Sequence, residues 1–140
     1  MKMWVVTILL GVALCLVAAI AWVRLAPTDV ARWHQMHADV QVTDLGNGAM
    51  RVVEAGTDDL ARLHAIIRDT ARTQVLAGSV EAGMITYVTR SAVIGFPDYT
   101  TLRLSGDKIE IFGRARFGVS DLGVNAARID GWLDALAQRG

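Results

Sequence analysis

Hydrophobic residues run without a charged interruption from Met3 to Val23, close to the start of the chain. About twenty apolar residues in a helix match the thickness of the hydrocarbon core of a bilayer. Trp4 and Trp22 stand near the two ends of the run, where indole side chains favour the membrane–water interface. The pattern therefore predicts a transmembrane anchor over residues 1–24, which contacts the lipid bilayer through residues 3–23.

A cleaved signal peptide is the main alternative for this run. Lys2 supplies a positive start, and residues 19–21 (Ala-Ile-Ala) have the small residues that a signal peptidase accepts. The apolar run continues past that point, which favours the anchor. A lipoprotein signal fits less well, because a leucine precedes Cys15 where a small residue is expected. Both alternatives still place the rest of the chain outside the cytoplasm.

The charges on the two sides of the run give conflicting signals about orientation. Lys2 and the terminal amine favour a cytoplasmic N-terminus, whereas Arg24 and Arg32 favour the opposite arrangement. Short N-terminal anchors usually export the domain attached to them. We therefore expect a single-pass protein of a bacterial inner membrane whose C-terminal domain lies in the periplasm.

A juxtamembrane segment over residues 25–39 follows the anchor. Pro27 ends the hydrophobic helix, and Thr28 or Asp29 can cap a short helical turn that ends at Trp33. Trp33 has two possible positions, the membrane interface or the surface of the domain, and the pattern does not choose between them. The segment contains no Gly/Ser linker, so the domain is expected to sit close to the bilayer.

Beyond residue 39 the pattern changes to short alternating runs, which are typical of half-buried strands. The strand-like runs are residues 40–42, 51–53, 74–80, 84–89, 101–104 and 108–116. Residues 47–48 (Asn-Gly) offer a tight turn between the first two, and residues 105–107 offer one between the last two. Residues 96–99 (Phe-Pro-Asp-Tyr) are expected to form a loop.

Two segments repeat apolar residues with the helical period. The apolar positions are Leu60, Leu63, Ile67 and Ala71 in the first and Ile129, Trp132, Leu133 and Leu136 in the second. Thr57 is expected to cap the first helix, and Ser120 or Asp121 the second. An antiparallel sheet with two main helices packed on one face buries both patterns, so we expect one α+β domain over residues 40–140.

Composition narrows the classes of function. The 14 basic and 14 acidic residues give a formal net charge of zero, which argues against a nucleic-acid binder. The single cysteine, Cys15, lies inside the hydrophobic run, so the aqueous part has no disulfide and no thiolate site. His34 and His37 could share a helical face with Asp39, but two histidines make a poor metal site. We predict neither a metal nor another cofactor.

The C-terminal half carries a specific polar string. Residues 89–91 are Thr-Arg-Ser, residues 95–99 are Gly-Phe-Pro-Asp-Tyr, and residues 114–125 read Arg-Ala-Arg-Phe-Gly-Val-Ser-Asp-Leu-Gly-Val-Asn, followed by Arg128. Together with Trp-Val-Arg-Leu-Ala-Pro at residues 22–27, this string resembles the domain of unknown function 1499 family. The resemblance covers most of the aqueous part and implies a small bacterial or plastid domain, often with an N-terminal hydrophobic segment. The family has no established activity, so no mechanism is implied.

The candidate site comes from the charged and amide residues of this string, which are Arg90, Asp98, Arg114, Arg116, Asp121, Asn125 and Arg128. As a functional site they would bind an anion, because guanidinium groups hold carboxylate or phosphate through paired hydrogen bonds. As structural residues they would form ion pairs, a helix cap and a loop hydrogen bond. The structural role is the commoner one for such residues at the ends of elements.

Two hypotheses for function emerge. The first is a non-enzymatic envelope domain that binds a partner protein or a small anionic ligand, since no hydrolytic or transfer motif is present. The alternative is an enzyme that acts on an anionic substrate, with Asp98 or Asp121 as acid or base and Arg90, Arg114 and Arg116 as the clamp. The oligomeric state stays open.

Overall fold

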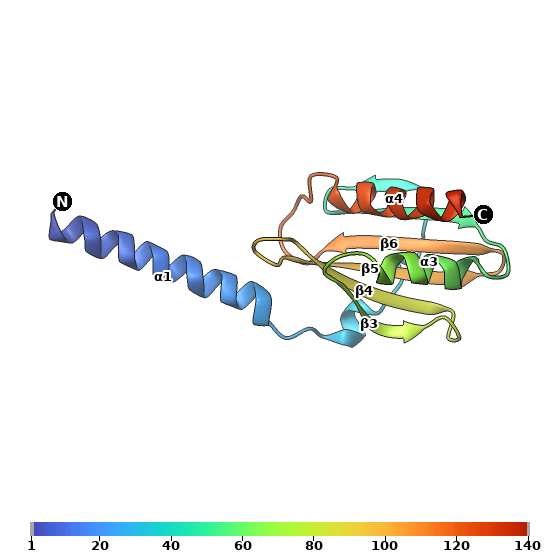
Figure 1. Ribbon diagram of the computed structural model, residues 1–140, viewed down its shortest axis with the longest axis horizontal. Coiled ribbons are helices and arrows are strands. Elements are labelled where there is room, and N and C mark those ends of the chain that lie inside the picture. Colours follow the sequence, from blue (N-terminus) through green and yellow to red (C-terminus); the bar gives the residue numbers. More distant parts are fainter. Residues whose placement is uncertain (1, 140) are drawn as a thin grey trace.

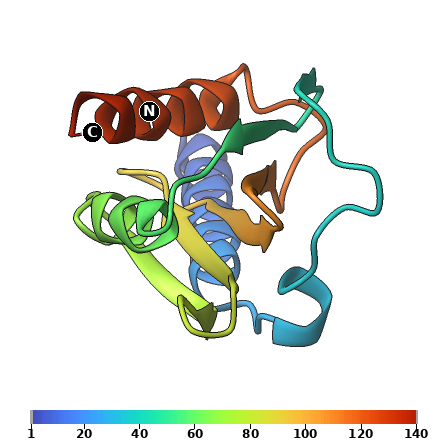
Figure 2. The same cartoon turned by 90° about the vertical axis from the view of Figure 1, so that its right-hand side faces the viewer.

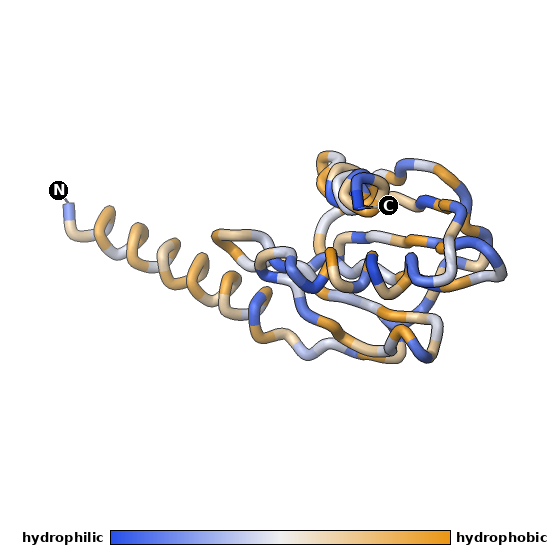
Figure 3. Tube along the Cα trace, turned by 45° about the vertical axis from the view of Figure 1, so that its right-hand side comes forward, coloured by the Kyte–Doolittle hydropathy of each residue, from blue (hydrophilic) through white to orange (hydrophobic). Residues whose placement is uncertain are grey.

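The computed structural model describes residues 2–139, so the outer limits of the predicted ranges, residues 1 and 140, lie outside it. Helix α1 (Met3–Leu25) extends away from the rest of the chain and buries none of its residues (Figure 1). Figure 3 shows it as apolar along its length, whereas the domain alternates between apolar and polar positions. The helix is long and apolar enough to cross a membrane, and an N-terminal signal sequence has the same properties.

The domain is built on a six-stranded sheet in which every neighbouring pair is antiparallel. Its strands in chain order are β1 (Thr43–Leu45), β2 (Gly48–Glu54), β3 (Thr73–Ser79), β4 (Met84–Arg90), β5 (Pro97–Ser105) and β6 (Lys108–Ala115). Their spatial order is β1-β2-β6-β5-β4-β3. With its two packed helices, the sheet confirms the predicted α+β class.

Helices α3 (Asp59–Arg68) and α4 (Val124–Gln138) pack on one face of the sheet (Figure 2). Leu63 and Ile67 of α3 and Ile129 of α4 are fully buried against strand residues such as Ile85 and Ile111. Each such aliphatic side chain contributes about 1.5–3 kcal/mol when it leaves water. The predicted helical stripes therefore form the core, with the exception of Ala71, which lies beyond the end of α3 and is exposed.

Several boundaries differ from the predicted ones. The first strand is β1 at residues 43–45 rather than 40–42, because Gly48 already pairs with Leu45 and the turn falls on residues 46–47. The predicted loop at residues 96–99 is wrong, since Pro97, Asp98 and Tyr99 open β5. Proline is tolerated at the first position of a strand, where its missing N–H breaks no ladder bond.

The helix caps also differ in part. Helix α3 begins at Asp59 and its N-cap Asp58 makes no side-chain cap bond, so Thr57 is not the cap. Instead the Asp59 carboxylate accepts a hydrogen bond from Gly56 N at 2.7 Å. A carboxylate in the first helical turn also interacts favourably with the helix dipole.

The second face of the sheet is covered by the juxtamembrane segment rather than by a helix layer (Figure 2). Its short helix α2 (Val30–Trp33) is capped by Asp29, as one of the two predicted alternatives. Trp33 stacks on Tyr99 of β5 with ring centroids 4.3 Å apart, and His34 Nδ1 lies 2.8 Å from Thr86 Oγ1. Trp33 therefore lies on the domain.

Arg114 of β6 holds this segment on the sheet. Its side chain donates to the backbone carbonyls of Trp33 and Gln35 and, at 2.9 Å, to Thr101 Oγ1. The guanidinium also stacks over the Phe112 ring at 4.5 Å. Burial lowers the pKa of Arg114 to about 10, and no carboxylate pairs with it within residues 2–139.

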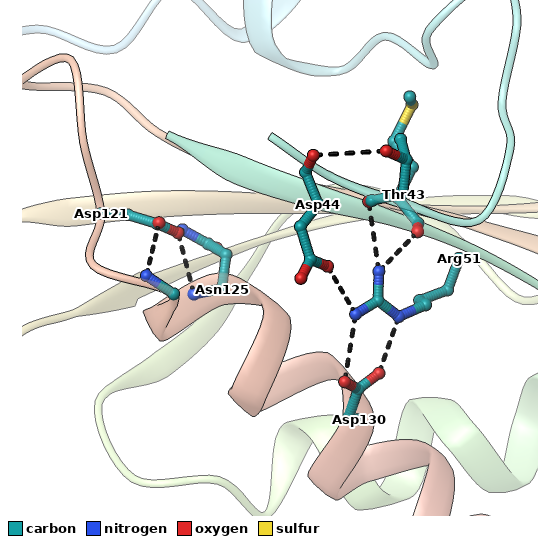
Figure 4. A network of polar contacts seen from close by, with 8 residues as sticks. Thr43, Asp44, Arg51, Asp121, Asn125 and Asp130 are labelled. Carbon is teal, nitrogen blue, oxygen red and sulfur yellow. Dashed lines mark hydrogen bonds and ion pairs between the residues drawn. The ribbon is translucent and has the colours of Figure 1, made fainter. Parts of the chain in front are cut away.

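A second arginine joins the sheet edge to α4. Arg51 donates through Nε to Asp130 at 2.8 Å and through a terminal nitrogen to Asp44 of β1 at 2.8 Å (Figure 4). The hydrogen bond from Arg51 lowers the pKa of Asp130. One side chain thus fixes the short edge strand β1, strand β2 and helix α4 relative to one another.

We predict that Arg114→Ala lowers the free energy of unfolding by about 3 kcal/mol, because buried carbonyls lose charged hydrogen-bond donors. Amide hydrogen exchange should also rise in residues 27–37. Arg103→Ala is the matched control, since Arg103 lies on the same sheet face in a half-exposed pair with Glu110 and should cost about 1 kcal/mol or less. Equal losses from the two variants in urea unfolding would contradict the assignment.

Candidate functional site

The seven predicted residues do not meet in one place. Successive residues of a strand point to opposite faces, and cross-strand partners share a face. Arg90, Arg114 and Arg116 lie on the face covered by the juxtamembrane segment, because Arg114 pairs with Tyr99 and Arg90 with Pro97. Asp98 points to the helix face.

On the helix face, four of the seven residues form a chain of hydrogen bonds at the start of α4. Asp121 accepts from Gly123 N at 3.0 Å, from Asn125 N at 3.0 Å and from Asn125 Nδ2 at 2.9 Å. Arg128 donates to Asn125 Oδ1 at 3.2 Å and to Asp98 Oδ2 at 3.1 Å. Asn125 is fully buried, so these bonds satisfy a polar group inside the core.

The pKa values of the two carboxyl groups in this hydrogen-bond network, Asp98 and Asp121, are shifted in opposite directions. Burial raises the pKa of the Asp98 carboxyl above its ordinary value, although Arg128 counteracts the rise. For Asp121, desolvation also favours the neutral acid, but the hydrogen bonds from Asn125 and Gly123 win and the pKa is lowered. Asp121 is therefore the ionised group that accepts hydrogen bonds from the first turn of α4, but the N-cap position is Gly123 and not the predicted Ser120 or Asp121. Burial disfavours the charged form of Asp98.

Arg116 contacts the juxtamembrane segment in the same way as Arg114. It donates to the carbonyl of Pro27 at 2.9 Å and to Tyr99 Oη at 3.4 Å. Tyr99 Oη also lies 3.2 Å from Thr28 Oγ1. In this structure Arg114 and Arg116 thus bind the protein's own backbone and side chains.

Three other arginines gather where α1 meets the sheet. Arg24, at the end of α1, Arg72, before β3, and Arg90, at the end of β4, line a shallow pocket of about 300 Å³. Gln74, Val88, Ser91, Ala92 and Gly95 complete its lining. Among the described residues no acidic side chain lines the pocket, and none of the ion pairs found within residues 2–139 involves these arginines.

Main-chain carbonyls orient the three guanidinium groups. Arg24 donates through Nε to Ile94 O at 3.0 Å and through a terminal nitrogen to Val93 O at 2.6 Å. Arg72 donates through Nε to the carbonyl of Arg90 at 3.1 Å, and Arg90 donates to Gly95 O at 2.9 Å. Each arginine is positioned by these bonds while some of its N–H donors remain available.

A second hollow of about 430 Å³ adjoins the first and shares Arg72, Arg90 and Ser91 with it. Asp98, Asp121 and Arg128 also line this hollow, together with Thr70, Ala71, Thr89, Phe96, Ala115 and Val124. Four of the seven predicted residues therefore border one hollow. Arg114, Arg116 and Asn125 do not line it.

Sequence reasoning missed Arg24 and Arg72 as site residues. Arg24 directly follows the hydrophobic run, so its charge bears in the sequence only on the orientation of that helix in a membrane. Arg72 sits in the connection between α3 and β3 with φ 56°, a left-handed conformation that brings its side chain beside β4. No spacing rule links these two residues to Arg90, since the three come from distant parts of the chain.

The histidines serve as hydrogen-bond partners. His37 Nδ1 lies 2.9 Å from the carbonyl of Asp39, and His64 Nδ1 lies 2.7 Å from Tyr87 Oη. Burial lowers the pKa of His64. Over residues 2–139, no group of three or more His, Cys, Asp or Glu side chains is arranged to hold a metal ion.

Asp121→Ala should lower the free energy of unfolding at pH 7 by about 1–2 kcal/mol, because the first turn of α4 loses its acceptor. The folded-state pKa of Asp121 is depressed, so its stabilisation is complete above about pH 4 and is lost as the pH falls through the folded-state value. Denaturant unfolding of both proteins between pH 7 and pH 2.5 tests this. A stability difference that stays constant or grows toward low pH would argue against an ionised Asp121 as the acceptor at the start of α4.

Comparison with known proteins places the chain in a family. A search of curated proteins finds no match. The family model described as protein of unknown function DUF1499 matches residues 33–136. The match starts at Trp33, the residue that stacks on the sheet, and covers α3, all six strands and α4 as far as Leu136. The resemblance seen in the sequence is therefore confirmed, and the chain belongs to the DUF1499 family.

Proposed function

We propose that this protein is a single-pass, membrane-anchored binding domain of the bacterial envelope that holds an anionic group in the arginine pocket. The observation that carries the proposal is that Arg24, Arg72 and Arg90 line one pocket that has no acidic side chain among its described lining residues. Three like charges in one place repel one another, so a bound anion relieves the repulsion. Carboxylate and phosphate oxygens suit the guanidinium geometry best.

The lining favours binding over catalysis. Besides the arginines it offers Gln74 and Ser91 as polar groups, and neither is a general base. Ser91 Oγ accepts from Gly95 N at 3.1 Å and from Phe96 N at 2.9 Å, which leaves its own O–H free to donate. A set composed mainly of donors fits an anion that is held and released unchanged.

The proposed membrane anchor sets the distance between the pocket and the lipid headgroups. Arg24 directly follows the hydrophobic run, and basic residues at that position lie at the headgroup level. The anionic group is therefore either the phosphate of a lipid headgroup or a soluble phosphate or carboxylate that approaches from the aqueous side. Both share the chemistry that the three arginines recognise.

An enzyme acting on an anionic substrate is the second candidate. The observation in its favour is that Asp98, a carboxyl whose pKa is raised by burial, borders the hollow that shares Arg72 and Arg90 with the pocket. A raised pKa suits an acid–base residue. Against it, Arg128 already holds Asp98 at 3.1 Å within the hydrogen-bond chain of α4.

Binding can be tested with the full chain in micelles of an uncharged detergent, using inorganic phosphate and a short-chain phosphatidic acid as probes. We expect the wild type to bind at least one probe and Arg72→Gln to bind it about tenfold to a hundredfold more weakly, because one charged hydrogen-bond donor is lost. Isothermal titration calorimetry measures both affinities.

Arg68→Gln is the matched control, because Arg68 is an exposed arginine at the end of α3 that does not line the pocket. It should bind like the wild type. Preference for the lipid over inorganic phosphate identifies a headgroup ligand, and equal affinity identifies a soluble anion. The proposal fails if the wild type binds neither probe, or if Arg72→Gln binds as the wild type does.

The proposed topology predicts that a reporter fused after residue 140 is active as alkaline phosphatase and inactive as a cytoplasmic fluorescent protein. The uncleaved chain should pellet with membranes and resist extraction at high salt and high pH, because about twenty apolar residues remain in the bilayer. Recovery of the intact chain in the supernatant without detergent would refute the anchor, and a mature N-terminus after Ala21 would establish a signal peptide.

A further inference from the structure

The loops at the two ends of the sheet differ in the polarity of the side chains that they expose. At the end near α1, the loops between β4 and β5 and between β6 and α4 expose large apolar side chains. Val93 is 83% exposed, Val119 93% and Leu122 92%, and the partly exposed Phe96 also belongs to this set. At the opposite end, the turns at residues 56–58, 80–83 and 105–107 carry glycines and acids. Several large aliphatic side chains exposed together to water are unfavourable, and such a group usually marks an interaction site.

The two apolar loops lie together. Phe96 and Phe117 bring them into contact, with ring centroids 6.3 Å apart. Figure 1 shows both loops at the end of the domain from which α1 extends, while the chain terminus of α4 lies at the other end. The exposed apolar side chains of both loops therefore lie at one end of the domain, which we call the apolar surface.

The first of these loops, residues 91–96, contacts the last turn of α1. Arg24 binds the carbonyls of Val93 and Ile94, and Arg90 donates to the carbonyl of Val23 at 3.5 Å. The loop at residues 91–96 is thus hydrogen-bonded to the helix at the point where the hydrophobic run ends. If α1 crosses a bilayer, the same bilayer surface is within reach of Val93.

We infer that the loops at residues 91–96 and 117–124 insert their apolar side chains into the headgroup region of the bilayer that α1 crosses. The occupant of the surface is lipid, because the surface is continuous with the anchor and has the arginines Arg24, Arg72 and Arg90 beside it. Apolar side chains next to cationic ones suit the border between acyl chains and anionic headgroups. The inference rests on the proposed membrane anchoring but not on the ligand of the pocket.

Docking at three points gives the domain a fixed orientation. One helix alone lets a domain turn about its tether, whereas the helix and two loops define a plane. The acidic turns and the C-terminal end of α4 then face away from the membrane. The arginine pocket is held at the level of the lipid headgroups.

The test uses the full chain with Cys15→Ser, reconstituted in nanodiscs of phosphatidylethanolamine and phosphatidylglycerol. A fluorophore is attached to Val119→Cys or Leu122→Cys, and to Asp107→Cys as the control in an exposed turn at the opposite end. We expect nitroxide lipids labelled near the headgroup to quench the first two fluorophores at least threefold more than the control. Iodide in the water should quench only the control strongly.

A further variant controls for insertion caused by the fluorophore itself. With the fluorophore at Val93→Cys, the pair Val119→Asp and Leu122→Asp should abolish most lipid quenching while the chain still copurifies with nanodiscs through α1. The inference is overturned if all positions are open to iodide, or if the loop positions are shielded from both quenchers, which would indicate a protein covering them. A chain that does not enter nanodiscs at all overturns the anchor and this inference together.

Discussion

The buried guanidinium of Arg114 is the group on which the arrangement of this protein depends. Helices cover one face of the sheet, and the other face is closed by an irregular segment whose backbone carbonyls need donors. Arg114 supplies several donors from one side chain, while Trp33 on Tyr99 supplies the apolar contact. The juxtamembrane segment is thereby part of the fold. Because it is fixed on the sheet, it also sets where α1 leaves the domain.

From that attachment the other features follow. A segment fixed along the sheet brings Arg24 to the loop at residues 91–96, where it meets two arginines from β4 and from the connection before β3. The arginine pocket is therefore made jointly by helix α1 and the domain. A freely tethered domain would have no such pocket, and its apolar loops would have no defined position relative to α1.

The polar string that characterises the C-terminal half has two physical tasks. Asp121, Asn125, Arg128 and Asp98 link the start of α4 to β5 through consecutive hydrogen bonds. Arg114 and Arg116 attach the juxtamembrane segment on the opposite face. Both tasks restrain the loops next to them, so that the exposed side chains of those loops are presented at one end. Internal hydrogen bonds thus occupy most of the seven candidate residues, and of these seven Arg90 lines the arginine pocket.

Local patterns were enough for the hydrophobic helix, the helical stripes of α3 and α4 and most strands, because periodicity and turn residues act over a few neighbours. Strand alternation likewise placed Arg114 and Arg116 on one face. The start of β5 at Pro97 and the position of Trp33 were not accessible in this way, because each depends on a contact between residues far apart in the sequence. Arg116 N donates to Pro97 O at 3.2 Å, and Trp33 stacks on Tyr99. The same holds for the meeting of Arg24, Arg72 and Arg90: pairing register and the packing of the juxtamembrane segment bring them together, and no short stretch of sequence encodes that distance.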